Sequence, residues 1–430
     1  MNDFESTALV DQVARVGAAQ HLWAMLKLPD PISTLLSLDA RHVPLFAELL
    51  HLKASSNLID ADHRKLCVRV LRSLVEKHGI LAMPPSLLLN NVVREGIHPR
   101  GGGSYADIWK GVWGEQSVCL KVLRIHLESD ERKREKVVLA FCKEAMVWTR
   151  LRHPNILPLL GVNVTEFLPA FCFISPWMEH GDIICYLKRN PDHDRLKSVY
   201  EIASGLAYLH ALKIIHGDIK GANVLVDDDH CCRLADFGLA TVAETQRMDS
   251  TTSTVKGTVR WMAPELFVGG GEGARKKWST DIYAYASTVY EIMTGHPPFP
   301  NLNEPAVIFK VASGKRPTKP SKGWCPKGMW TMVELCWTED PFLRPRAAQI
   351  KEYLSKLVLL ESNAGHLDGV GANVSPASPV MTWSLSQWVW KSLVPTFWRA
   401  STIPDPYEEA LNQSFQDIFA RQRLKKGNFI

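Results

Sequence analysis

Residues 214–226 of the chain, IIHGDIKGANVLV, place a polar cluster between two apolar runs typical of strands. This pattern predicts a tight loop. Within it, Asp218 can accept a proton from a hydroxyl, Lys220 can neutralise a phosphoryl oxygen and Asn223 can ligate a divalent ion. These three residues are therefore candidate catalytic residues, and Asn223 is also a candidate metal ligand.

A second acid follows thirteen residues after Asn223, where Asp236 lies in the run Leu-Ala-Asp-Phe-Gly at 234–238. An acid between apolar residues and before a glycine suits a metal ligand at a mobile hinge. Taken alone, either Asp218 or Asp236 is more often a capping or turn residue. Two such loops at this spacing favour a functional site instead.

A glycine-rich turn and a lysine precede these loops. Residues 101–108, GGGSYADI, would let the backbone approach a phosphate closely. Lys121 lies in an apolar run at 118–123, 20 residues after Gly101. A lysine in a buried strand must find an anion or lose its charge. Taken singly, such a turn is more often a plain loop, and such a lysine more often extends to solvent.

The order of these motifs resembles that of the protein kinase family. The matching parts are the loop at 101–108, the strand at 118–121, the segment 216–223, Asp236-Phe237-Gly238 and Ala263-Pro264-Glu265. The resemblance covers residues 94–358. It implies an α+β, two-lobed protein kinase fold with a small β-rich lobe and a larger helical lobe. Strand-like runs early in this range and helical patterns after about residue 195 agree with it.

The resemblance implies that the chain binds ATP and Mg²⁺. Lys121 is expected to pair with the α- and β-phosphates and with Glu144, on a helix expected at 127–150. Asn223 and Asp236 resemble the two Mg²⁺ ligands, and Asp218 resembles the catalytic base. The residues expected to bind the nucleotide are Gly101, Gly102, Gly103, Ser104, Ile108, Cys119, Lys121, Glu144, Ser175, Trp177, Met178 and Leu225.

Three further residues are expected to stabilise the large lobe. Asp281 resembles the buried acid that braces the catalytic loop. Glu265 and Arg344 resemble an ion pair, and breaking a buried pair costs roughly 3–5 kcal/mol.

The sequence departs from the family at three positions. Ala106 replaces the third glycine, which predicts a stiffer loop that still binds ATP. Cys119 replaces a slightly smaller alanine. Gly217 replaces the arginine that usually receives an activation-loop phosphate, so a constitutively ordered loop is expected.

A pseudokinase scaffold that binds nucleotide and partners without phosphoryl transfer is the alternative function. Ala106 and Gly217 favour it, and five retained residues oppose it. These five are Lys121, Glu144, Asp218, Asn223 and Asp236.

The class of hydroxyl that accepts the phosphate is indicated by Lys220 and Thr258, which resemble the serine/threonine pattern. Protein substrates with Ser/Thr hydroxyls, in intracellular signalling, are therefore expected, and dual specificity stays open. Segments 153–157, 176–178 and 260–265 resemble the tyrosine-kinase-like group of serine/threonine kinases. His-Gly-Asp with Lys-Gly-Ala-Asn resembles kinases abundant in mushroom-forming fungi, where a leading helical segment is also frequent.

The remaining segments lie outside this range. Residues 1–90 have helical apolar spacing and predict a small packing module or a partner-binding module. Residues 361–380 are rich in Gly, Ser, Asn and Pro and predict a linker. The tail, 381–430, contains a Trp-rich stretch that could dock on the kinase domain, bind a partner while disordered, or contact a membrane surface. Residues 250–254 are either a solvated polar loop or an autophosphorylation cluster.

The composition excludes several other classes. The 430 residues allow about two or three domains. The net charge of +5 is spread along the chain, so nucleic-acid binding is not expected. Nine scattered cysteines without a CxxC pair favour reduced thiols in a cytoplasmic protein over a zinc site or disulfide framework. The first residues do not resemble a secretory signal, and no apolar run of ~18 residues predicts a spanning helix.

Overall fold

The structure is a computed structural model that describes residues 17–56, 58–102, 106–124, 131–237, 258–268, 276–321, 325 and 328–367. Four predictions lie outside these residues: the roles of Gly103 and Ser104, the polar loop 250–254, residues 368–380 of the linker and the tail 381–430.

Helices form the first part of the chain, where the apolar spacing predicts them. Asp30 begins one of them by accepting the Ser33 N–H, and Asp60 begins another by accepting the Asp62 and His63 N–H groups. The elements are a helix over 17–26, α2 (Pro31–Leu36), η1 (Ala40–His42), α3 (Val43–Ser55), α4 (Ala61–His78), η2 (Gly79–Ala82) and η3 (Pro85–Leu87). We call residues 17–56 and 58–90 the N-terminal module.

An antiparallel sheet follows, with strand order β1-β3-β4-β6-β5 and β2 paired with β3. A tight turn joins β3 to β4, and Gly114 adopts φ 61° there, a conformation that favours glycine. The strands are β1 (Val92–Arg94), β2 (Gly101–Gly102), β3 (Ala106–Trp113), β4 (Gln116–Leu123), β5 (Gly161–Asn163) and β6 (Cys172–Pro176). Helix α5 (Glu131–Trp148) packs on the sheet through Phe141, whose ring centroid lies 4.5 Å from that of Phe173.

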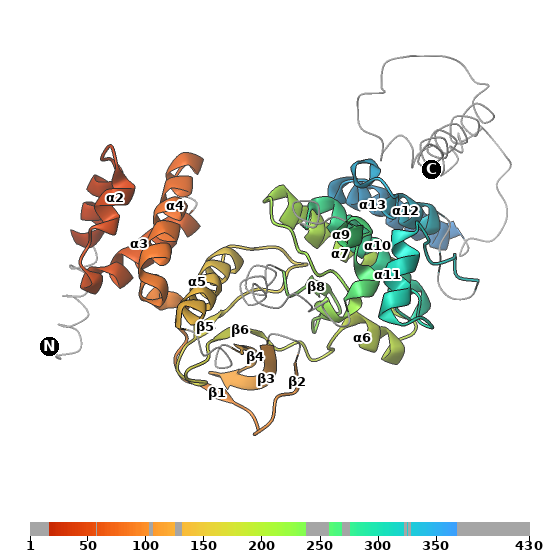
Figure 1. Ribbon diagram of the computed structural model, residues 1–430, viewed down its shortest axis with the longest axis horizontal. Coiled ribbons are helices and arrows are strands. Elements are labelled where there is room, and N and C mark those ends of the chain that lie inside the picture. The colour runs from red at the N-terminus through yellow and green to blue at the C-terminus, as the bar shows by residue number, and fades with distance from the viewer. Residues whose placement is uncertain are drawn as a thin grey trace, which may run out of the picture.

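The larger lobe is mainly helical and lies on the other side of the sheet from the N-terminal module (Figure 1). Its elements are α6 (Ile183–Arg189), α7 (Arg195–Ala211), η5 (Gly221–Asn223), β7 (Val224–Val226), β8 (Cys232–Leu234), η6 (Val259–Trp261), α9 (Glu265–Val268), α10 (Trp278–Thr294), α11 (Glu304–Ala312), α12 (Met329–Cys336), η8 (Pro341–Leu343) and α13 (Ala347–Leu367). Most side chains of α10 are buried, so this helix is the centre of the lobe. The two-lobed α+β fold is confirmed.

Helix α13 corrects one predicted boundary. The sequence predicts a linker from residue 361, but α13 continues to Leu367. The first seven residues of that segment include Glu361, Ala364 and Leu367, which are good helix formers. The glycine-rich composition that predicts a linker begins only at Gly369.

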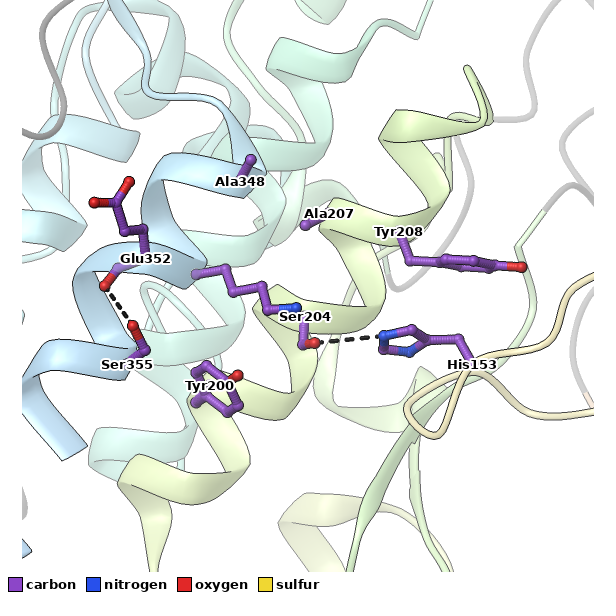
Figure 2. Close-up of a pocket in the computed structure, with 9 residues that line it drawn as sticks. His153, Tyr200, Ser204, Ala207, Tyr208, Ala348, Glu352 and Ser355 are labelled. Carbon is purple, nitrogen blue, oxygen red and sulfur yellow. Dashed lines mark hydrogen bonds between the residues drawn. The ribbon is translucent and has the colours of Figure 1, made fainter. Parts of the chain in front are cut away.

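Helices α7 and α13 pack against each other and leave a hollow of about 470 Å³ at their surface (Figure 2). His153 reaches this hollow from the segment between α5 and β5. Its ring stacks on Tyr208 at 4.9 Å, and its Nε2 lies 3.5 Å from Ser204 Oγ (Figure 2). This contact fixes the segment after α5 to the large lobe.

All nine cysteines lie in the described part of the chain, and each is a free thiol. No helix among the described residues is long and apolar enough to cross a membrane.

The predicted ion pair between Glu265 and Arg344 is confirmed. Arg344 Nη1 lies 2.7 Å from Glu265 Oε1, and Nη2 lies 2.9 Å from Oε2. The Arg344 side chain is fully buried and also donates to the carbonyls of Ser279 and Thr338. The pair therefore joins α9 to the start of α10 and to the segment before α13.

Replacing Glu265 with glutamine should destabilise the large lobe, because the buried Arg344 guanidinium loses its counter-charge. Breaking such a pair costs about 3 kcal/mol or more, so we expect a lower urea midpoint for the full chain. Glu339→Gln is the matched control, since it removes the half-exposed acid 2.7 Å from Arg316 and should cost under about 1 kcal/mol. Equal losses in both variants would contradict the role of Glu265.

Candidate active site

The loop that carries the candidate catalytic residues is held by a buried acid of α10. Asp281 accepts the backbone N–H groups of His216 and Gly217, both at 2.8 Å, and lies 2.9 Å from His210 Nε2. Its side chain is 1% exposed, so these donors replace the water that a carboxylate needs. The expected role of Asp281 as a brace for this loop is confirmed.

Glycine at position 217 suits this geometry. Gly217 adopts φ 78°, which is a left-handed conformation. This conformation is unfavourable for any residue that has a side chain. This conformation occurs where its N–H points at Asp281. The departure at this position therefore leaves the loop intact.

Asp218, Lys220 and Asn223 form one hydrogen-bonded cluster. Lys220 Nζ donates to Asp218 Oδ2 at 2.8 Å, and Asn223 Nδ2 donates to the same oxygen at 2.9 Å. Burial is the largest single effect and would raise the pKa of Asp218, but Lys220, together with His216 and Lys276, outweighs it and holds that pKa below its ordinary value. Asp218 is therefore an ionised carboxylate that can orient or accept a hydroxyl proton.

Lys220 also contacts the segment before α9. Its Nζ lies 3.1 Å from Thr258 Oγ1, while it keeps its bond to Asp218. The two residues that indicate the serine/threonine pattern in the sequence therefore lie side by side, although 38 positions separate them.

Asp236 and Lys121 bring the two lobes together. Lys121 Nζ, on β4, makes an ion pair with Asp236 Oδ1. The lysine side chain is 9% exposed and that of Asp236 is 37% exposed, so the acid is the more accessible of the two. Asp236 adopts φ 62°, and the next residue, Phe237, is buried against Trp148 of α5 and His216.

The expected pairing of Lys121 with Glu144 is not present. Glu144 is buried, and neither of its carboxylate oxygens has a hydrogen-bond partner among the described residues. Burial raises the pKa of Glu144 to about 8, with Asp236 adding to the effect of burial and Lys121 opposing it. A carboxyl that burial keeps protonated attracts an ammonium weakly, and Lys121 pairs with Asp236 instead.

Most of the candidate nucleotide residues lie in strands β2, β3, β4, β6 and β7 or directly after β6. Ile108 lies opposite Lys121 in the β3–β4 register, and Cys119 lies opposite Ser175 in the β4–β6 register. Gly101 and Gly102 form β2, and Leu225 lies in β7. Trp177 and Met178 directly follow β6.

Two details bear on how these residues could hold a nucleotide. The N–H of Met178 donates to no group within the described residues, so it is available to a ligand. Ala106 has a negative φ in β3, so alanine fits where the family usually has glycine.

The donor set fits a magnesium nucleotide. Asn223 uses its NH₂ group on Asp218, and its amide oxygen has no hydrogen bond in the described part of the chain. This oxygen and the Asp236 carboxylate are hard ligands of the type Mg²⁺ prefers. Lys121 supplies a positive charge for phosphate oxygens on the same side of the cleft.

A family profile described as protein tyrosine and serine/threonine kinase matches residues 97–354. The chain belongs to this family. The match includes every candidate site residue named above.

Three related kinases illustrate the likeness. Serine/threonine-protein kinase STY17 of Arabidopsis thaliana is 33% identical over 60% of this chain and 43% of its own length. Probable serine/threonine-protein kinase roco7 of Dictyostelium discoideum is 33% identical over 60% of this chain and 10% of its own. Serine/threonine/tyrosine-protein kinase HT1 of Arabidopsis thaliana is 30% identical over 59% of this chain and 64% of its own length. The match therefore covers less than two thirds of each relative.

One residue that contacts the candidate site was missed from the sequence alone. Glu291 on α10 accepts the Gly221 N–H at 3.0 Å and the Trp261 indole N–H at 3.1 Å. It thus connects the catalytic loop to the segment before α9. A glutamate in the apolar run Val289–Met293 is the signal that could have identified it, because a buried acid needs specific donors.

Replacing Glu291 with glutamine should change how stability depends on pH. Burial raises the pKa of Glu291 to about 7 from an ordinary 4.5, despite the two donors that favour the carboxylate. Folding therefore favours the neutral acid, and the stability it contributes is complete below pH 4.5 and is lost as the pH rises through about 7.

Glutamine keeps a neutral acceptor for the same donors at every pH. Between about pH 5 and pH 8, E291Q should gain stability relative to wild type, by at most about 3 kcal/mol. Urea unfolding at a series of pH values measures this difference. A difference that stays constant over the series would show that Glu291 does not titrate in this range.

Proposed function

We propose that this protein transfers the γ-phosphate of ATP to serine or threonine hydroxyls of protein substrates. The observation that carries the proposal is that the Lys121–Asp236 pair lies next to the Asp218–Lys220–Asn223 cluster, since the N–H of Ala235, the residue before Asp236, donates to the Asn223 carbonyl at 2.9 Å. These residue types match the charges that phosphoryl transfer develops. Beyond family membership, we propose an activity, a substrate class and a role in intracellular signalling for this protein.

Each residue then has one task. Asp218 accepts the proton of the attacking hydroxyl, because its carboxylate is ionised and lies in the loop that Asp281 holds. Lys220 lies beside it and offsets negative charge on the transferred group. Asn223 and Asp236 would hold Mg²⁺, which supplies charge neutralisation and orientation of the phosphates. Lys121 would bind phosphate oxygens.

Two observations support serine/threonine over tyrosine as the acceptor. Lys220 contacts Thr258 directly, which places the two residues of the serine/threonine pattern next to the catalytic base. STY17 and roco7 carry serine/threonine-kinase names, whereas the name of HT1 also includes tyrosine. We therefore propose a tyrosine-kinase-like serine/threonine kinase in the cytoplasm, where its nine free thiols would stay reduced.

A pseudokinase scaffold is the weaker alternative. It requires a chain that binds nucleotide but lacks a catalytic acid or a metal ligand. Asp218, Asn223 and Asp236 are all present, and Asp218 is ionised within reach of Lys220. Neither Ala106 nor Gly217 disturbs the backbone around the cleft. These observations support an active enzyme.

Replacing Asp218 with asparagine should reduce phosphate incorporation at least about a hundredfold, because the proton acceptor is lost. The assay uses radiolabelled ATP, Mg²⁺ and a generic basic protein substrate. Acid hydrolysis of the wild-type product should release phosphoserine or phosphothreonine. Asp228→Asn, at an exposed acid outside the cleft, is the matched control and should keep wild-type activity. Equal incorporation by D218N and wild type would refute the catalytic proposal.

Metal removal should weaken nucleotide binding, because Asn223 and Asp236 would bind ATP through Mg²⁺. Ligand binding raises the melting temperature by mass action, so ATP should stabilise wild type more in Mg²⁺ than in EDTA. In D236N this Mg²⁺-dependent gain should disappear, while D228N should retain it. An equal ATP shift with and without Mg²⁺ in wild type would contradict the proposed ligands.

A further inference from the structure

The N-terminal module packs directly on α5, the helix that carries Glu144. Helix α4 and the turn η2 both contact α5 (Figure 1). One ion pair crosses this contact, with Lys143 Nζ 2.8 Å from Glu76 Oε1. The Lys143 ammonium holds the pKa of Glu76 below its ordinary value, as expected for a formed pair. The module therefore covers a flank of α5 rather than extending away from the kinase domain.

Apolar packing continues across the same contact. Buried residues of the module, such as Leu74 and Met83, belong to one uninterrupted core cluster with Phe141 and Cys142 of α5. Residues buried in one continuous core resist separation because each exposed apolar group costs free energy. The module and α5 are thus expected to move together.

The end of the module is also fixed to the sheet. The Leu89 N–H donates to the Val162 carbonyl at 2.8 Å, and Asn163 Nδ2 donates to the Leu89 carbonyl at 2.8 Å. Gly161 allows this close approach, because a Cβ at that position would lie 2.6 Å from the Leu87 oxygen. Two attachments, one at α5 and one at β5, therefore hold the module in place.

The large lobe holds the segment after α5. The Arg152 N–H donates to the Tyr208 hydroxyl at 3.0 Å, and the His153 ring stacks on the same tyrosine (Figure 2). With the N-terminal module against the helix itself, α5 is supported from two sides. This helix in turn presents Trp148 to Phe237 and Glu144 to the neighbourhood of Lys121 and Asp236.

We propose that the N-terminal module is an intramolecular brace that sets the position of α5, with Glu76 and Lys143 as its positioning residues. The proposal deepens the proposed function and rests on it for its effect on catalysis. Lys143 immediately precedes Glu144, so a shift of α5 that separates Lys143 from Glu76 also moves Glu144 relative to Lys121. Neither Glu76 nor Lys143 lies in the cleft.

Charge reversal tests the brace. The variants are Glu76→Lys, Lys143→Glu and the double exchange, which restores an ion pair of opposite polarity. Arg72→Ala is the matched control, since Arg72 is an exposed partner of Glu76 on the same helix, at 3.7 Å. Hydrogen–deuterium exchange of the α5 amides is the first measurement. The second is kcat and the KM for ATP.

Each single reversal should speed α5 exchange and raise the KM for ATP about two- to fivefold. The effect is modest because Lys143 and Glu76 are 33% and 45% exposed and exposed pairs are weak. The double exchange should return both readouts toward wild type, and Arg72→Ala should leave them unchanged. Exchange of the α10 amides should not change, which separates loss of the brace from general unfolding.

Unchanged α5 exchange and KM in both single reversals, or a double exchange no better than either single variant, would overturn the proposal. Gly161→Ala is a second perturbation that loosens the module at β5, and it should also speed α5 exchange. The exchange measurement needs no activity. A wild type that incorporates no phosphate would therefore refute the proposed function, while α5 exchange would still decide whether the brace exists.

Discussion

The site depends on a buried carboxylate of α10 that holds the backbone of the catalytic loop. Asp281 accepts two successive N–H groups, from His216 and Gly217, and water cannot replace them because the acid is 1% exposed. Ten residues along the same helix, Glu291 accepts the Gly221 N–H. Ten residues of helix span about 15 Å. Helix α10 therefore holds the loop at two points, and Asp218 lies between these two points in the sequence.

The other part of the site contains one positive charge and two carboxyl groups. One ammonium, on Lys121, faces two carboxyl groups, those of Asp236 and Glu144. The partly exposed Asp236 takes the ion pair, and buried Glu144 is left without a partner among the described residues. A ligand that engages Asp236 through a metal would compete for that carboxylate, and Lys121 would then be free to turn toward phosphate or Glu144.

The fold and most of the site could be predicted because their signals are local. Glycine next to the candidate catalytic acid, an acid before Phe-Gly and a lysine in an apolar strand are each patterns of a few neighbouring residues. What the sequence could not predict depends on contacts between distant segments. The partner of Lys121 is 115 positions away, and burial of Glu144 is a property of the packed structure. Glu291 was missed for the same reason, since its donors come from two other segments.

Helix α5 is also held by contacts with segments that are distant in the sequence. The catalytic loop has glycine at position 217, so the arginine that the family usually places there is missing as a receiver for a loop phosphate. A cleft without that control still needs α5 in place, because Trp148 packs on Phe237 and Glu144 lies near Lys121. In the proposed brace, the N-terminal module meets this need through the Glu76–Lys143 pair and the shared apolar core. The position of α5 would then depend on how this module packs.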